Sequence, residues 1–255
     1  MSVVPWYPDH RMAILSPNTP FDLVHVGKCG GGSISSELRA GNYDFEHYHM
    51  RRPAARPDRR YVILVRDPVA RFVSAFNWRT HLYRTGGLPR ANATDRISQL
   101  RHRAEEEFLL SFDNANALAE QLVPVGQYEV SPISVLLGLI GHVPHGFQWY
   151  LGRLLDQIEP RQIAGVVCTE RLADDFVHLF GFQPAMEIHR SAGSYSTHFS
   201  EKARANLVRE FHNEYATLKK LASIADEAGT TMSMRYDPKE GAIPNQSKSA
   251  GVPRL

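Results

Sequence analysis

The stretch that decides the fold is FDLVHVGKCGGGSI, residues 21–34. Its first six residues are mostly apolar and end at Gly27, as in a short buried strand. Three consecutive glycines then let the backbone turn sharply and approach a ligand without a Cβ in the way. Ser33 stands where a helix would begin, and Lys28 adds a full positive charge. The pattern predicts a strand, an anion-binding turn and a helix.

A second strand with such a turn is YVILVRDPVARFVS, residues 61–74. Its five apolar residues suit a buried parallel strand. Asp67 is well placed as the N-cap of the following helix and Pro68 as its first residue, which leaves Arg66 at the tip of the strand. Two anion-binding turns about 40 residues apart indicate one ligand with two separate anionic groups, as in a nucleotide-like donor.

The first turn differs from the P-loop of nucleoside triphosphate enzymes. That loop reads G-x-x-x-x-G-K-[ST], with the lysine after the glycines, whereas Lys28 precedes them. Such an enzyme also needs an acidic side chain at the end of a strand to hold Mg²⁺, and Arg66 stands there instead. A guanidinium in place of the carboxylate favours direct binding of an anion, and we expect no metal site.

Strands and helices alternate along the chain. Further strands are expected at residues 44–50 and 163–168. Helical periodicity is found at residues 33–39, 69–83, 104–122, 132–141, 170–180 and 200–228. This order predicts an α/β fold, a three-layer P-loop-like sandwich around a mostly parallel sheet, with a helical insertion in the middle and a long C-terminal helix.

The expected domain spans residues 20–234. It follows an extended arm at residues 1–19 and precedes a disordered tail at residues 235–255, because both ends are rich in proline and lack an apolar period. A chain of 255 residues with 43% hydrophobic content is long enough to bury a full core.

The location expected from the sequence is cytoplasmic. The longest apolar run, near residues 135–140, is far shorter than the roughly 20 residues that a membrane helix needs, so no stable membrane insertion is expected. The start of the chain has no basic region followed by an apolar run. Cys29 and Cys168 are the only cysteines, which supports neither a disulfide framework nor a thiolate metal site.

Positive charge is concentrated in one part of the chain. Residues 51–103 hold 13 arginines against three aspartates, a balance of +10, although the whole chain carries only +2 and the rest therefore −8. Such a block favours a polyanionic ligand or an acidic acceptor. The alternative is that arginine is simply frequent in this chain, with 23 Arg against 6 Lys, and that most of these side chains lie in solvent.

Together the two motifs resemble the sulfotransferases that use 3′-phosphoadenosine 5′-phosphosulfate (PAPS), especially the carbohydrate-type branch. The matching patterns are K-x-G-G-x-S at residues 28–33 and R-D-P-x-x-R-F-x-S-A-F-N at residues 66–77, and the strong match covers residues 21–79. Weaker similarities follow at residues 149–152, 169–172 and 195–200.

The resemblance implies which residues hold the donor. In the family, the glycine loop and its lysine cradle the 5′-phosphosulfate, and the arginine and serine of the second motif hold the 3′-phosphate. The implied contacts are Lys28, Cys29, Gly30, Gly31, Gly32 and Ser33 at the 5′ end, and Arg66 and Ser74 at the 3′ end. Cys29 stands where the family often has a small or hydroxyl residue. The implied co-substrate is PAPS, with PAP as its product.

Transfer of a sulfuryl group to a hydroxyl needs a base, positive charge at the leaving oxygen and in-line positioning. Lys28 would supply the charge. The segment FEHYHM, residues 45–50, lies between the two motifs and resembles the family segment that carries the base. If it is extended, its two histidines point the same way, and a reference pKa of about 6.5 suits a base. His49 is the first candidate, His47 the second and Glu46 the carboxylate alternative.

The leading hypothesis is a PAPS-dependent sulfotransferase that acts on a carbohydrate hydroxyl, in a glycan, polysaccharide or glycolipid. The candidates for an acceptor platform are Trp78, Arg79, His81 and Tyr83, with Trp149 and Tyr150. Two alternatives are a P-loop small-molecule kinase that uses Mg-ATP and a non-catalytic polyanion-binding module. No nucleic-acid partner is expected.

Arg71 of the second motif has two possible roles. It is either a third donor to the ligand or the partner of Asp67 one helical turn away.

Overall fold

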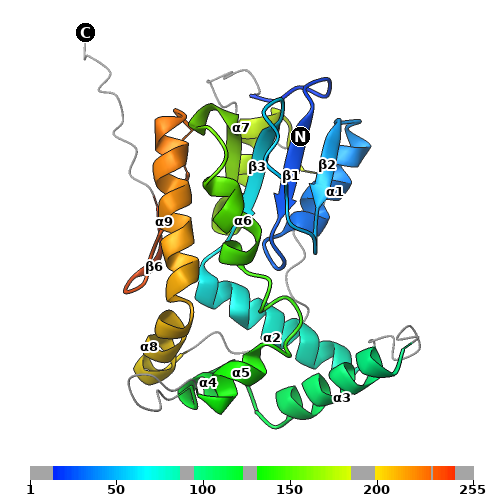
Figure 1. Cartoon of the computed structure of the whole chain (residues 1–255), viewed down its shortest axis with the longest axis vertical. Coiled ribbons are helices and arrows are strands. Elements are labelled where there is room, and N and C mark those ends of the chain that lie inside the picture. The colour runs from blue at the N-terminus through cyan, green and yellow to red at the C-terminus, as the bar shows by residue number, and fades with distance from the viewer. Residues whose placement is uncertain (1–13, 87–94, 123–130, 185–198, 231, 245–255) are drawn as a thin grey trace, which may run out of the picture.

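The computed structural model describes residues 14–86, 95–122, 131–184, 199–230 and 232–244 (Figure 1). Its centre is an all-parallel sheet of four strands in the order β2-β1-β3-β4. The strands are β1 (Phe21–His25), β2 (Phe45–Tyr48), β3 (Arg60–Val65) and β4 (Ile163–Cys168). Each coincides with a strand predicted from the sequence, and the predicted α/β fold is confirmed.

Helices cover both faces of this sheet. In Figure 1, α6 (Phe147–Leu155) and α9 (His212–Glu227) lie in front of it, and α7 (Leu172–Phe180) lies behind. A Cβ on Gly165 of β4 would come within 2.3 Å of the Leu179 side chain, so α7 packs directly on the backbone of that strand. Every residue of β1 and β4 is buried, as expected for strands covered on both faces.

Two helices follow the anion-binding turns, α1 (Gly31–Ala40) and α2 (Pro68–Arg84). Asp67 caps α2 as predicted, because its carboxylate accepts the Ala70 N–H at 2.9 Å. Short 3₁₀ turns, η2 (Pro160–Gln162) and η3 (Thr169–Arg171), flank β4.

The predicted helical insertion lies between α2 and β4. It contains α3 (Arg96–Leu110), α4 (Ala115–Glu120) and α5 (Pro132–Leu137). With α2 and α8 (Glu201–Glu210), these helices enclose a second apolar core below the sheet in Figure 1. The single helix predicted at residues 104–122 is two helices, since Asn114 accepts the Ala117 N–H and starts a new one. The single helix predicted at residues 200–228 is also interrupted, at Phe211, whose ring packs against Phe72.

The prediction of a disordered tail at residues 235–255 is wrong for its first part. An antiparallel hairpin forms from β5 (Met234–Asp237) and β6 (Gly241–Pro244). Tyr236 holds it in place, because its side chain packs against both apolar cores and its hydroxyl donates to Glu170 at 2.8 Å. Residues 245–255 lie outside the described residues, as do residues 1–13 of the predicted arm. Among the described helices, none combines the length and the hydropathy needed to cross a bilayer.

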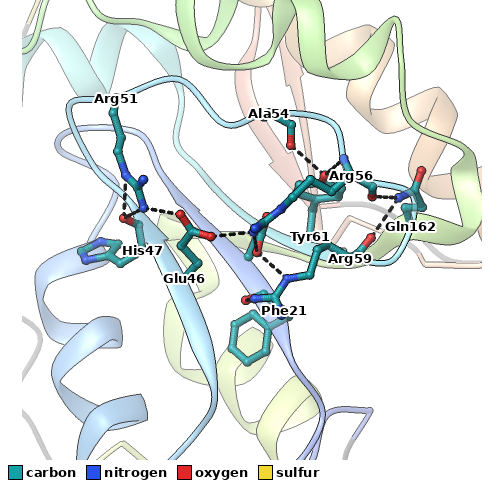
Figure 2. A network of polar contacts seen from close by, with 10 residues as sticks. Phe21, Glu46, His47, Arg51, Ala54, Arg56, Arg59, Tyr61 and Gln162 are labelled. Atoms are coloured by element: carbon teal, nitrogen blue, oxygen red, sulfur yellow. Dashed lines mark hydrogen bonds and ion pairs between the residues drawn. The ribbon is translucent and has the colours of Figure 1, made fainter.

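A buried carboxylate ties the amino-terminal end of the sheet together (Figure 2). Asp22 of β1 is fully buried and accepts from Arg56 at 2.7 Å and from Arg59 at 2.9 Å. Arg56 also donates to Glu46 of β2 at 2.6 Å, so it joins two neighbouring strands. Two arginines of the block predicted to face an anion are therefore paired with carboxylates of the protein.

We expect Asp22→Asn to lower the free energy of unfolding by about 2 kcal/mol, less than a fully buried pair because both arginines keep some contact with water. The substitution leaves two guanidinium groups around a neutral acceptor. Denaturant unfolding measures the loss. Asp58→Asn, an exposed position in the loop that holds Arg56 and Arg59, should change it by less than about 0.5 kcal/mol. Equal effects of the two substitutions would contradict this assignment.

Candidate functional site

The predicted site residues meet at the carboxyl-terminal edge of the sheet. Because all four strands are parallel, the glycine loop after β1, His49 after β2 and Arg66 after β3 follow the same ends of neighbouring strands. In open α/β sheets, ligands bind outside this edge. The sheet topology therefore brings together the two motifs and the segment between them.

The glycine loop ends in an uncapped helix. Gly30, the N-cap of α1, has the left-handed φ of 77° and provides no side-chain cap. The first backbone bond back into the loop is made by Ile34, whose N–H donates to the Gly30 carbonyl at 3.3 Å. The N–H groups of Gly31, Gly32 and Ser33 precede that bond at the positive end of the helix, which is an arrangement that binds anions.

Two glycines of this loop have different surroundings. A Cβ on Gly31 would lie 2.2 Å from ring atoms of His25, whereas a Cβ on Gly32 would meet nothing within 4 Å. Gly31 is thus required for the packing of α1 on the end of β1. Gly32 leaves open space in front of the helix terminus.

Cys29 lies in the core. Its side chain is fully buried, its N–H donates to the Val26 carbonyl at 3.2 Å, and burial raises its thiol pKa to about 12. Neither its thiol nor its N–H is directed to a ligand, so we drop Cys29 from the predicted donor contacts.

Lys28 and Arg66 are held next to each other. Arg66 Nη1 donates to the Lys28 carbonyl at 3.1 Å, which joins the two motifs directly. Lys28 Nζ lies 4.8 Å from the centre of the Trp78 ring. Burial, reinforced by Arg66, lowers the Lys28 pKa to about 8. Neither cation forms an ion pair within the described parts of the chain.

Ser74 and Arg71 are the other two side chains of the second motif for which the sequence predicted a contact. Ser74 is half-buried on α2, and among the described residues no hydrogen bond joins it to Arg66. Among the described residues Arg71 forms no ion pair with Asp67: its buried guanidinium donates to the carbonyls of His142 at 2.8 Å and Val143 at 3.2 Å. Arg71 thus fixes a loop of the insertion, and its role as a third donor to the ligand stays a prediction.

The two predicted histidines face the same way, together with one that the sequence analysis missed. The ring of His25, the last residue of β1, lies 4.1 Å from that of His49 and 5.2 Å from that of His47. His142 adds a fourth ring, 5.9 Å from that of His49. One signal in the sequence could have identified His25 as a site residue, namely its position at the end of the strand that leads into the glycine turn.

Glu46 faces the opposite side of β2. Its carboxylate accepts from Arg51 at 2.8 Å and from Arg56 at 2.6 Å, as Figure 2 shows. Hydrogen bonds, first from Arg51, lower its pKa. A carboxylate held between two arginines on the far face of the strand is poorly suited to act as the base.

The histidines also differ in which ring nitrogen is free. His49 Nδ1 lies 3.3 Å from the His25 carbonyl, which only accepts, so Nδ1 carries the proton and Nε2 the lone pair. Among the described residues, none hydrogen-bonds to that Nε2. His47 has Arg39 3.3 Å from its Nδ1 and His25 3.0 Å from its Nε2. Burial and Arg39 lower the His47 pKa to about 4, so His49 is the better-placed base.

The insertion positions His142. Glu105 of α3 is buried and accepts the Gly141 N–H at 2.7 Å, together with Arg79 Nε at 2.6 Å and the Tyr83 hydroxyl at 2.8 Å. These bonds hold His142 against the glycine loop. They also remove Arg79 and Tyr83 from the predicted acceptor platform, since both side chains bind Glu105.

One member of that platform, Trp78, lies beside the candidate site. Trp78 is 41% exposed and contacts Lys28. The Tyr150 hydroxyl instead accepts the Met50 N–H at 2.8 Å inside the core. Trp149 lines a cavity of about 540 Å³ between α6 and α9, and none of the glycine-loop residues lines that cavity. The two halves of the predicted platform are therefore separated.

Within the described residues, no group of three or more His, Cys, Asp or Glu side chains has the geometry to hold a metal ion. Neither a protein-family model nor a curated protein matches this chain. The site must be interpreted from its own geometry.

Gly31→Ala should lower the free energy of unfolding by about 1–3 kcal/mol, because the new methyl group displaces the His25 ring. Gly32→Ala, on the same helical turn, should leave stability within about 1 kcal/mol of the parent, since alanine favours the helix and meets open space. Thermal or urea unfolding of both variants checks the contrast. If Gly31→Ala proves as stable as Gly32→Ala, the contact between His25 and Gly31 is not as described.

Proposed function

We propose that this chain is a PAPS-dependent sulfotransferase that moves a sulfuryl group to a carbohydrate hydroxyl. The observation that carries the proposal is the juxtaposition at one sheet edge of three features: a glycine helix terminus without a side-chain cap, two cations and the Nε2 of a histidine. Neither the cations nor this Nε2 has an ion-pair or hydrogen-bond partner among the side chains that the structure describes. A donor with two anionic ends would satisfy the first two features, and an acceptor hydroxyl would need the third.

The residues present fit the donor at its 5′ end. Three N–H groups at the start of α1 and the Lys28 ammonium would hold the phosphosulfate, and the open space in front of Gly32 leaves room for it. Arg66 would take the 3′-phosphate, with Ser74 as the second contact that the family resemblance implies. The lowered pKa of Lys28 supports an anionic ligand, because an anion would relieve the repulsion between Lys28 and Arg66.

The proposed reaction uses His49 as a general base. The acceptor oxygen forms a bond to sulfur while the bond from sulfur to the phosphate oxygen of the donor breaks. His49 Nε2 takes the acceptor proton, and the resulting imidazolium later releases it to water. Lys28 and the helix N–H groups stabilise the negative charge that develops on the departing phosphate oxygen. The products are a sulfate ester and PAP.

The kinase alternative receives less support from the side chains. Asp67, the carboxylate next to Arg66, accepts from Ala70 N–H and from the Tyr215 hydroxyl at 3.0 Å. It therefore caps α2 and anchors α9, and Arg66 occupies the strand tip where a metal-holding acid would be needed.

The polyanion-binding alternative rested on the arginine block. Several of these arginines form ion pairs with carboxylates of the protein: Arg51, Arg56, Arg59, Arg79 and Arg103. Carboxylates of the same chain therefore balance the charges of these arginines. What remains next to the glycine loop is a small cationic site, which suits a mononucleotide donor better than a long polyanion.

We expect PAP to raise the melting temperature of the protein without added metal, and AMP and Mg-ATP to raise it much less. Arg66→Ala should weaken PAP binding by at least about tenfold, because a charge-assisted contact to phosphate is lost. Arg60→Ala, at the opposite end of the same strand, is the matched control and should bind PAP normally. Thermal shift and calorimetry measure both. Unchanged PAP affinity in Arg66→Ala would reject the site, and a preference for Mg-ATP would favour the kinase.

PAP affinity should also fall as the pH rises from 7 to 9. Lys28 has a lowered pKa of about 8 when free, and the bound anion would raise that pKa, so binding requires the protonated amine and weakens as the amine loses its proton. The expected loss is about tenfold by pH 9. Lys28→Arg should give a nearly flat profile over this range. A steep decline that persists in Lys28→Arg would assign the titration to another group.

A further inference from the structure

His25 lies at the centre of the histidine cluster although neither motif includes it. It is 8% exposed, and its ring packs against the backbone of Gly31 on one side and the ring of His49 on the other. The planes of the two imidazoles differ by 16°, so they stack. His25 thus connects the glycine loop to the candidate base.

The hydrogen bonds of the cluster are compatible with one arrangement of protons. The Arg39 guanidinium only donates, so His47 Nδ1, 3.3 Å away, must carry a lone pair. A neutral His47 then has its proton on Nε2 and donates it to His25 Nδ1 at 3.0 Å. His25 must in turn carry its proton on Nε2. The direction of donation therefore runs from Arg39 to His47 to His25.

His49 has the opposite tautomer, and its contacts are with His25 as well. Its Nδ1 faces the His25 carbonyl at 3.3 Å, which requires a proton on that nitrogen. The same residue thus contacts His49 twice, through its carbonyl and through its ring. A ring held on one face and bonded at Nδ1 keeps Nε2 in a fixed direction.

We propose that His25 is a positioning residue: the donation from Arg39 through His47 fixes its ring, and the fixed ring and carbonyl hold His49 in the tautomer whose Nε2 is free to accept a proton. The catalytic role given to His49 rests on the proposed sulfuryl transfer, whereas the proton arrangement does not. His25 itself contacts neither substrate nor donor in this scheme.

The surroundings keep His25 neutral. Burial first, and then the neighbouring His49, His47, His142 and Lys28, lower its pKa to about 2. The groups around it are cationic or imidazole side chains, from β2, the glycine loop and the insertion. His49 therefore stacks on an uncharged ring that does not compete with it for a proton near neutral pH.

Two variants of His47 separate this role from simple packing. His47→Gln retains an N–H donor where Nε2 stood, and His47→Met has a similar size without a donor. His47 is half-buried on an edge strand, so both should fold. The measurement is nitrogen-15 NMR of histidine-labelled full-length protein, which reports the tautomer of each ring. His25→Leu tests the ring itself.

In the parent protein we expect the proton on Nε2 of His25 and His47 and on Nδ1 of His49. His47→Gln should keep His49 in that tautomer, and in His47→Met and His25→Leu the ratio of the two His49 tautomers should shift by about tenfold toward Nε2–H. A parent protein with Nε2–H on His49 or Nδ1–H on His47 overturns the proposal, as does His47→Met indistinguishable from His47→Gln.

PAP binding by the same samples separates the two claims. If PAP fails to stabilise the parent protein, the proposed function fails while the tautomers still decide the role of His25. If PAP binds and the tautomers differ from those expected, the positioning role fails while the donor site stands.

Discussion

The parallel pairing of β1 with both β2 and β3 is the constraint on which the rest of the structure depends. Phe21 lies opposite Phe45 on one side and Arg60 on the other, and this register continues to the carboxyl ends of the strands. Three segments that are separate in sequence therefore emerge at one edge: the glycine loop, the histidines and Arg66. A shift by one residue in β2 would turn His47 and His49 to the face now occupied by Glu46. Asp22 and Arg56 oppose that shift, because they join β1 to Glu46 of β2.

The sequence was sufficient to predict elements with strong local signals. The four strands, the Asp67 cap and the common orientation of His47 and His49 follow from apolar runs, proline at the first helical position and the two-residue period of a strand. The hairpin after α9 was missed because prolines and a glycine interrupt its short strands, whereas its order comes from long-range contacts of Tyr236. Cys29 was assigned by its place in a motif, and its burial depends on the whole core.

Charge was the least predictable property. The arginines between residues 51 and 103 give a large local sum, but their partners lie elsewhere in the sequence: Asp22 and Glu46 precede the block, and Glu105 follows it. Composition therefore exaggerates the positive potential of this region. In the structure Lys28 and Arg66 lie close together. The positive charge of the site therefore depends on how near these two side chains are, and not on how many arginines the region contains. Burial first, and then the neighbouring Arg66, lower the pKa of Lys28, and an anion bound beside the two cations would stabilise the site.

The backbone around the site carries strain that the surrounding residues must hold. Of the four non-glycine residues with positive φ in the described part of the chain, Lys28, Met50 and His142 all border the candidate site. Each costs about 1 kcal/mol or more relative to an ordinary conformation, so each needs support. Met50 donates to the Tyr150 hydroxyl, Arg71 binds the His142 carbonyl, and Arg66 binds the Lys28 carbonyl. Arg66 thus supports the backbone of the glycine loop and also contributes positive charge to the site. Because the strained residues are the ones that present the lysine and support the histidines, the contacts from the insertion and the apolar core help to hold this edge in a conformation that the local sequence alone would not adopt.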